Sequence, residues 1–256
     1  MLYACESGSR ARGFESTDSD YDVRFIYIHR TDWYLSLRKR RDVIERMVGE
    51  KLDFAGWDLT KALHLFSKSN PPLFEWLQSP IVYRELGRLA SRLRLLMPDY
   101  FSPKSCIFHY LHMARGNYRE YLHGDEVWVK KYFYVLRPVL SCLWIERGLG
   151  VMPTRFSTLV EGLVDDRDLR RDIAWLLKEK KRGSELDQGP RVESISNFID
   201  QQLARLSTDH QQKAPEKNLS ALDRLFAETL IEVNGPGILV QQPYSHDFNR
   251  LQAESE

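Results

Sequence analysis

The sequence has few cysteines and no long apolar run, and each absence excludes a class of protein. Its three cysteines, Cys5, Cys106 and Cys142, are far apart and show no paired spacing, so buried free thiols are expected rather than a disulfide framework or a zinc site. No run of about 18 or more apolar residues is present, the length that indicates a membrane-spanning helix. No signal-peptide pattern precedes the first apolar segment, which predicts a cytoplasmic location.

The chain also has almost no net charge. Its 37 lysines and arginines nearly balance its 36 aspartates and glutamates, which excludes a globally basic nucleic-acid coat but not a basic groove. Two basic runs are present. We expect Arg38-Lys39-Arg40-Arg41 to be a solvated loop or helix face rather than a nucleic-acid contact. Lys180-Lys181-Arg182 is better explained by a helix end, where positive charge complements the helix dipole.

One N-terminal segment places a turn and two acids between two predicted strands. The apolar runs Leu2–Cys5 and Val23–Ile28 predict the strands, and a Ser7-Gly8-Ser9 turn follows the first. Side chains two residues apart on a strand share a face, so Asp20 and Asp22 are expected to project side by side. Adjacent carboxylates repel each other unless a cation lies between them, and such ligands suit a hydrated Mg²⁺ that also contacts phosphates. Because the turn offers N–H groups and hydroxyls to phosphate, the segment predicts the apparatus of nucleotidyl transfer.

The spacing of these residues resembles a known signature. Gly8-Ser9, then ten residues, then Asp20-Tyr21-Asp22 is similar to the signature of the DNA polymerase β-type nucleotidyltransferase superfamily. Further blocks resemble the nucleotidyltransferases found beside RNA ligases in bacteria and phages: Glu6 to Tyr27, Gly56-Trp57-Asp58-Leu59, Ser69-Asn70-Pro71-Pro72 through Gln78-Ser79-Pro80, and Lys130 to Pro138. The resemblance covers roughly the first 205 residues.

We therefore expect an α+β fold in three parts. Residues 1–98 would form the nucleotidyltransferase domain, a mixed β-sheet with flanking helices, and residues 103–206 an all-α helical bundle. Residues 207–256 would be a polar linker followed by an amphipathic tail helix. Similar proteins carry a helical segment before the first strand, so the chain is expected to be shortened at its N-terminus.

Helical periodicity places several elements of this fold. It predicts a helix over Tyr83–Met97 that Pro98 closes, and a helix start at Ser102-Pro103. It also predicts a long apolar helix over Val127–Arg147. Pro138 should kink or split that helix, because proline cannot donate the backbone hydrogen bond of a helix interior.

A third carboxylate is needed near the attacking hydroxyl, as a metal ligand or as a general base. The superfamily places it on a neighbouring strand, which is where Asp53 falls, in the predicted strand Lys51–Ala55. Asp58 is the rival. It precedes the predicted helix Leu59–Lys68, where an aspartate is well explained as the N-cap. We therefore assign the catalytic role to Asp53 and a structural role to Asp58.

The predicted helix Val127–Arg147 carries a second group of candidate residues. Lys130, Tyr134 and Arg137 are expected to share one face, with a solvent-facing stripe of side chains as the alternative explanation. In similar enzymes a helical domain closes over the nucleotide and offers a lysine and a tyrosine to it. The resemblance therefore implies that Lys130 or Lys131 meets the triphosphate.

The N-terminal turn supplies the remaining candidate ligands of the nucleotide. Gly8 and Ser9 are expected to bind the β- and γ-phosphates, and Arg10 and Arg12 to neutralise phosphate charge. Arg12 departs from the family pattern, because similar proteins often have an aromatic residue at this position. We expect it to change how the base or the acceptor is seated.

These residues predict a nucleotidyltransferase that uses Mg²⁺ or Mn²⁺ and transfers a nucleoside monophosphate from an NTP, with ATP as the expected donor. Asp20, Asp22 and Asp53 would hold the metal ions. Because members of the family are found beside RNA ligases, the resemblance implies an RNA hydroxyl as acceptor, in RNA end processing or repair. It also implies association with an RNA ligase. The alternatives are AMP transfer to a protein hydroxyl, transfer to an aminoglycoside-like molecule, and a degraded enzyme that only binds RNA or a partner. Three clustered carboxylates argue against the last.

Overall fold

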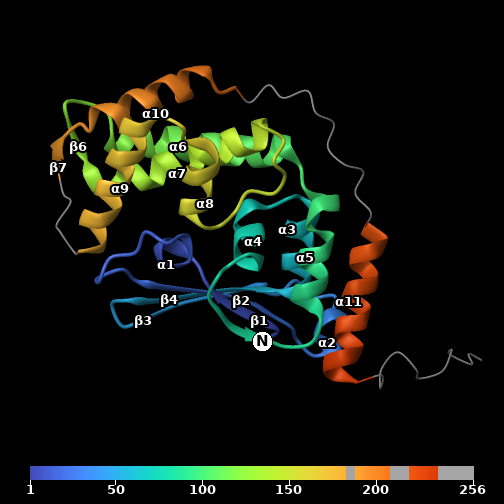
Figure 1. The fold of residues 1–256 in the computed structure, drawn as a ribbon. Helices are drawn as coiled ribbons and strands as arrows, with labels where there is room; N and C mark the ends of the chain where they lie inside the picture. Colours follow the sequence, from blue (N-terminus) through green and yellow to red (C-terminus); the bar gives the residue numbers. More distant parts are fainter. Residues whose placement is uncertain (183–187, 208–218, 236–256) are drawn as a thin grey trace, which may run out of the picture.

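A five-stranded mixed sheet forms the base of the N-terminal half (Figure 1). The computed structural model describes residues 1–182, 188–207 and 219–235. The strand order is β3-β4-β2-β1-β5, and only the central pair β2 and β4 runs parallel. The strands are β1 (Tyr3–Glu6), β2 (Tyr21–Tyr27), β3 (Val43–Val48), β4 (Leu52–Asp58) and β5 (Val82–Glu85). This sheet confirms the mixed-sheet part of the expected α+β fold.

Helices cover one face of the sheet. These are α3 (Leu59–Ser67), α4 (Pro71–Leu77) and α5 (Leu89–Tyr100), with the shorter α1 (Gly8–Arg12) and α2 (Thr31–Tyr34) at the strand ends (Figure 1). Tyr3 and Ile26, paired across β1 and β2, are fully buried against Phe66 and Phe74 of these helices. The first core therefore forms where alternate strand residues meet apolar helix faces.

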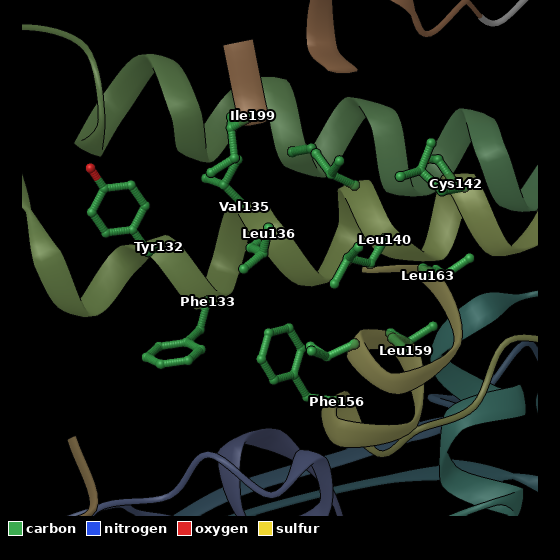
Figure 2. Close-up of a cluster of buried hydrophobic side chains, with 14 of the residues drawn as sticks. Tyr132, Phe133, Val135, Leu136, Leu140, Cys142, Phe156, Leu159, Leu163 and Ile199 are labelled. Atoms are coloured by element: carbon green, nitrogen blue, oxygen red, sulfur yellow. The ribbon is translucent and has the colours of Figure 1, made fainter. Parts of the chain in front are cut away.

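A helical bundle follows, above the sheet in Figure 1. It contains α6 (Pro103–Tyr121), α7 (Tyr132–Glu146), α8 (Phe156–Leu163), α9 (Arg167–Lys181) and α10 (Glu193–Arg205), with the small strands β6 (Glu126–Trp128) and β7 (Gln188–Pro190) at one end. Figure 2 shows α7 at the centre, where Phe133 and Leu140 point toward Phe156 and Leu159 of α8. All four side chains are buried. The helical second half is thus confirmed.

The long apolar helix begins later than its sequence pattern predicts. Residues 126–128 pair with β7 instead, and Val129–Lys131 form one 3₁₀ turn, η1, before α7 starts at Tyr132. Pro138 lies inside α7 without splitting it. The residues from Val135 to Cys142 are all buried, so packing on every side offsets the one backbone hydrogen bond that proline cannot donate.

The helix predicted over Tyr83–Met97 is wrong at both ends. Residues 82–85 are the edge strand β5, which pairs antiparallel with β1, and α5 begins only at Leu89. Strand pairing overrides a local helical pattern here. At the other end Pro98 lies within α5, which continues to Tyr100. The buried Tyr100 ring packs 5.1 Å from Phe66, between ring centroids, and holds this last turn in place.

The C-terminal helix α11 (Leu219–Asn234) packs against the N-terminal half rather than the bundle. It lies beside α3 and α5 in Figure 1, and Leu222 and Leu225 are buried in the core that those helices share with the sheet. The expected linker at residues 207–218 falls, after Ser207, outside the described residues, as does the end of the tail. Within the described ranges, none of the helices combines the length and the apolar character needed to cross a bilayer.

Candidate functional site

A cavity of about 610 Å³ lies between the N-terminal turn and the helical bundle. Five basic and three acidic side chains line it, together with four serines, one glycine and one tyrosine. The lining residues are Ser7, Gly8, Ser9, Arg12, Ser16, Asp18, Ser19, Asp20, Asp22, Arg24, Lys130, Lys131, Tyr134 and Lys180. The structure therefore brings together Gly8, Ser9, Arg12, Asp20, Asp22, Lys130, Lys131 and Tyr134, which come from two distant stretches of sequence.

Gly8 is in direct contact with Asp22. The Ser7 N–H donates to the Asp22 carbonyl oxygen at 2.8 Å, which holds the segment after β1 against β2, and the short helix α1 starts at Gly8. Gly8 has φ +55°, and a Cβ atom at this position would lie 1.8 Å from Asp22 Oδ2. Only glycine combines this conformation with so close an approach. The backbone thus forms a cradle beside the carboxylate.

The three candidate carboxylates occupy different environments. Asp20 is exposed just before β2, and Asp22 is half-buried within it. Asp53 is the direct neighbour of Asp22 across the parallel β2–β4 pair, but it does not line the cavity. Sequence reasoning therefore identified acids that do meet at one end of the sheet, with Asp53 one strand further out.

Arg24 separates Asp22 from Asp53, and sequence reasoning missed it. Its Nη2 atom lies 2.9 Å from Asp22 Oδ1 and 2.7 Å from Asp53 Oδ2. The signal was available, because Arg24 follows Asp22 by two residues on a strand and so shares its face. A guanidinium, which stays charged, therefore holds the two carboxylates together.

Burial dominates the electrostatics of Asp22. It raises the pKa of this carboxyl, and the negative charges of Asp53 and Glu6 raise it further, whereas Arg24 opposes them. Glu6 is itself buried and accepts the Asp22 backbone N–H at 2.7 Å. A cation bound in the cavity would favour the ionised form of Asp22.

Asp58 has the structural role expected of it. It is fully buried and caps α3, since its Oδ1 atom accepts the Thr60 N–H at 2.9 Å. Its Oδ2 atom accepts the Tyr34 hydroxyl at 2.7 Å. Both oxygens are engaged far from the cavity lining.

Lysines form the wall of the cavity opposite the acids. Lys130 and Lys131 come from η1, and Lys180 comes from the end of α9. Lys131 Nζ lies 4.2 Å from the ring centroid of Tyr121. Because positive charge gathers here, this wall suits a polyphosphate.

Lys180 is the second residue that sequence reasoning missed. Its Nζ atom lies 4.8 Å from the Phe14 ring centroid and 5.1 Å from that of Phe133. Burial, and then repulsion from Lys130 and Lys131, lowers its pKa to about 8. In the sequence, the helix dipole accounts for the basic run that includes Lys180. No local pattern distinguishes Lys180 from its neighbours.

The arginines divide between the cavity and the framework. Arg12 lines the cavity and is paired with Glu75 at 3.0 Å. Arg10 does not line it. Its guanidinium stacks 3.9 Å from the Tyr21 ring centroid and donates to the backbone oxygens of Ser19 and Asp20, so it fixes the loop that carries Asp20.

Arg137, expected on one cationic face with Lys130 and Tyr134, is instead buried at 2% exposure. Its Nη1 atom lies 2.9 Å from Glu75 Oε1. Tyr134 does line the cavity. The 3₁₀ turn that carries Lys130 changes the helical spacing on which the expected face depended.

The donor set fits a divalent cation that also needs a phosphate ligand. Among residues 1–182, 188–207 and 219–235, no group of three or more His, Cys, Asp or Glu side chains is arranged to hold a metal. Asp20 and Asp22 nevertheless both face the cavity beside the Gly8 cradle. Mg²⁺ usually binds through one or two carboxylates and completes its shell with water and substrate phosphates.

A family model and a curated relative each match most of the chain. Residues 1–228 match the model of a family described as the RNA repair pathway DNA polymerase beta family. The chain is 48% identical over 235 residues to the protein YcgL of Bacillus subtilis (strain 168), which is described as uncharacterized. The aligned region makes up 91% of this chain and 90% of YcgL.

A solved nucleotidyltransferase-like protein from Exiguobacterium sibiricum 255-15 is 10% identical to this chain. The superposed region covers 90% of this chain and 82% of the solved protein. Its TM-score of 0.31 is too low to add to the fold described above. The family match, which spans both halves of the chain, confirms the resemblance seen in the residues. The chain belongs to the RNA repair pathway DNA polymerase beta family.

Proposed function

We propose that this chain transfers a nucleoside monophosphate from an NTP, with ATP as the expected donor, to a hydroxyl group of RNA in the cytoplasm. The observation that carries the proposal is one cavity with Asp20 and Asp22 on one side and Lys130, Lys131 and Lys180 on the other. Its volume of about 610 Å³ lies within the range of about 300 to 1,000 Å³ of small-molecule sites. Acids beside a lysine wall suit a metal-bound triphosphate.

The chain would bind the donor through both walls. Asp20 and Asp22 would hold Mg²⁺ or Mn²⁺, which when bound neutralises phosphate charge and orients the α-phosphate. Gly8 and Ser9 would contact the β- and γ-phosphates, since a side chain at Gly8 would fill that space.

Side chains from the bundle complete the donor site. Lys130, Lys131 and Lys180, with Arg12, would balance the remaining phosphate charge. Tyr134, half-exposed at the cavity wall, would lie beside the nucleotide.

Asp53 would serve the acceptor. The acceptor oxygen would bond to the α-phosphorus while the bond from that phosphorus to the bridging oxygen breaks, so pyrophosphate leaves. Asp53 would take the proton of the attacking hydroxyl, because its carboxylate is 35% exposed and lies one strand from Asp22. An ionised carboxylate in hydrogen-bond reach is a suitable general base.

RNA is the proposed acceptor because the family description names RNA repair. The resemblance that links such proteins to RNA ligases supports the same choice. A transferase that modifies an RNA end would supply a ligase with its substrate, so an RNA ligase is the expected partner.

Calorimetry of ATP binding in the presence of Mg²⁺ tests the donor site. We expect binding to wild-type protein and its loss, by at least tenfold in affinity, when Asp20→Ala and Asp22→Ala are combined. Asp18→Ala is the matched control, because this aspartate also lines the cavity but is 82% exposed and paired with Lys51. Equal binding by the double variant and the control would contradict the proposal.

Incubation of α-labelled ATP with total RNA and with total protein tests the acceptor. Label in RNA that depends on Asp20 and Asp22 supports the proposal. Label in protein would replace the acceptor with a protein hydroxyl. Binding without label in either fraction would indicate a module that only binds nucleotide or RNA.

A further inference from the structure

Arg24 occupies the space between two of the three candidate metal ligands. One nitrogen, Nη2, is within 2.9 Å of a carboxylate oxygen of both Asp22 and Asp53. A carboxylate oxygen that accepts such a charged hydrogen bond has its negative charge already compensated. The guanidinium therefore offsets part of the charge of the pair and occupies the position between Asp22 and Asp53 that a bridging cation would take.

Contacts on both sides hold Arg24 in this position. Its Nη1 atom donates to the Val23 carbonyl oxygen at 3.2 Å and to the Asp53 carbonyl oxygen at 3.1 Å. The side chain is only 17% exposed. Two carboxylates and two backbone carbonyls thus surround the guanidinium, whose planar fork fits several acceptors at once.

The two oxygens of Asp22 face different partners as a result. Oδ1 accepts from Arg24, whereas Oδ2 lies against the Gly8 backbone. Of the candidate metal ligands that line the cavity, the Asp22 Oδ2 atom and the exposed carboxylate of Asp20 remain to meet a cation. One cation position, rather than two, is consistent with this division.

The charge of the cavity also supports a single cation position. Its five basic and three acidic lining residues provide positive charge that a two-metal site would obtain from its second ion. Arg12 and Arg24 are paired with carboxylates, but Lys130, Lys131 and Lys180 are also fixed parts of the chain, so their charge is present before any ion binds.

We propose that Arg24 is a built-in cation that takes the place of one divalent ion, so that the site binds a single divalent cation together with its nucleotide. This inference rests on the proposed function. Arg24 would also act as a positioning residue, because it holds Asp53 beside Asp22 through the Asp53 Oδ2 atom. The other carboxylate oxygen of Asp53 is then left to accept a proton.

Equilibrium gel filtration in buffer containing Mn²⁺ and α,β-methylene-ATP tests the inference on the wild-type chain. The Mn²⁺ and the nucleotide that travel with the protein are both measured. We expect one Mn²⁺ per bound nucleotide. Two Mn²⁺ per nucleotide would overturn the inference and leave the proposed function standing, whereas no bound nucleotide would overturn the proposed function itself.

Arg24→Ala tests the role of the guanidinium directly. Its removal leaves Asp22 and Asp53 uncompensated, so we expect the ratio to rise from one Mn²⁺ per nucleotide toward two. Arg46→Ala is the matched control, since Arg46 is an exposed arginine of the neighbouring strand β3 and does not line the cavity; its ratio should stay at one. A folded Arg24→Ala protein, judged by circular dichroism, that keeps a ratio of one would overturn the inference. If the Arg24→Ala protein does not fold, the number of Mn²⁺ per nucleotide on the wild-type chain alone tests the inference.

Discussion

At the scale of single residues, Gly8 shows how much depends on a missing side chain. A Cβ atom would clash with Asp22 Oδ2, and the residue has a left-handed backbone conformation. We expect Gly8→Ala to weaken Mg²⁺-dependent ATP binding at least tenfold, measured by calorimetry. Gly13→Ala isolates the clash, because Gly13 also has a positive φ of +83° but has open space at its Cβ position. Both variants should lose about 1 kcal/mol of stability from the left-handed conformation, and equal ATP binding by the two would contradict the role of Gly8.

Lys180 should make nucleotide binding depend on pH. Its pKa of about 8 means that the free chain loses this positive charge as pH rises through 8, whereas a bound phosphate favours the charged form. ATP affinity should therefore fall roughly tenfold between pH 7 and pH 9. Lys180→Arg should remove this dependence, because arginine stays charged. Lys181→Arg, at an exposed position outside the cavity lining, should leave it unchanged, and the same slope in both variants would exclude Lys180 as its source.

At the scale of elements, α11 should stabilise the domain that binds the donor. Leu225 is 3% exposed within the N-terminal core, whereas Leu219 in the same helix is 53% exposed. Leu225→Ala should lower the free energy of unfolding in urea by about 2 to 4 kcal/mol, through lost burial and a cavity. Leu219→Ala should change it by less than about 0.5 kcal/mol. Equal effects would mean that α11 is not docked on α3 and α5 in solution.

At the scale of the whole molecule, Glu75 joins the two halves of the chain. Its carboxylate, in α4, accepts from Arg12 of α1 and also from Tyr110 and Arg137 of the bundle, at 2.6 to 3.0 Å. Burial raises its pKa, but Arg137 and Arg12 outweigh burial and bring it to about 2. The same network positions Arg12 at the cavity, so contact between the two halves supports the donor site.

The sign of the Glu75 pKa shift determines its effect on stability. Because its pKa is lower in the folded chain than the ordinary 4.5, its contribution is complete above about pH 4.5 and is lost as pH falls toward 2. Glu75→Gln should lower the free energy of unfolding at pH 7 by about 3 kcal/mol, since it leaves buried arginines uncompensated. It should also flatten the acid dependence of that free energy.

Glu85→Gln is the matched control for this experiment. Glu85 pairs with Arg94 at 2.9 Å in the N-terminal half, and both side chains are about one-third exposed, so its loss should cost less than about 1 kcal/mol. An equal loss in the two variants, or an unchanged acid dependence in Glu75→Gln, would show that Glu75 does not contribute as a buried ion pair.

Sequence reasoning succeeded where a local rule decides the structure. Asp58 precedes an amphipathic helix and caps it, and Ser102 caps α6 ahead of Pro103. It failed where distant pairing overrides local preference. Residues 82–85 have a helical pattern yet pair with β1, and residues 126–128 pair with β7, about 60 residues later in the chain.

The sequence by itself determined the family and the acids of the candidate site, because Gly8, Ser9, Asp20 and Asp22 are set by spacing within one short segment. Only the tertiary structure decided which cations meet those acids. Arg24 reaches Asp53 because β2 and β4 lie in parallel register. Lys180 reaches the cavity because α9 packs with the bundle beside α1 (Figure 1). Charges that meet across a fold come from elements far apart in the chain, so no spacing within a single segment could reveal them.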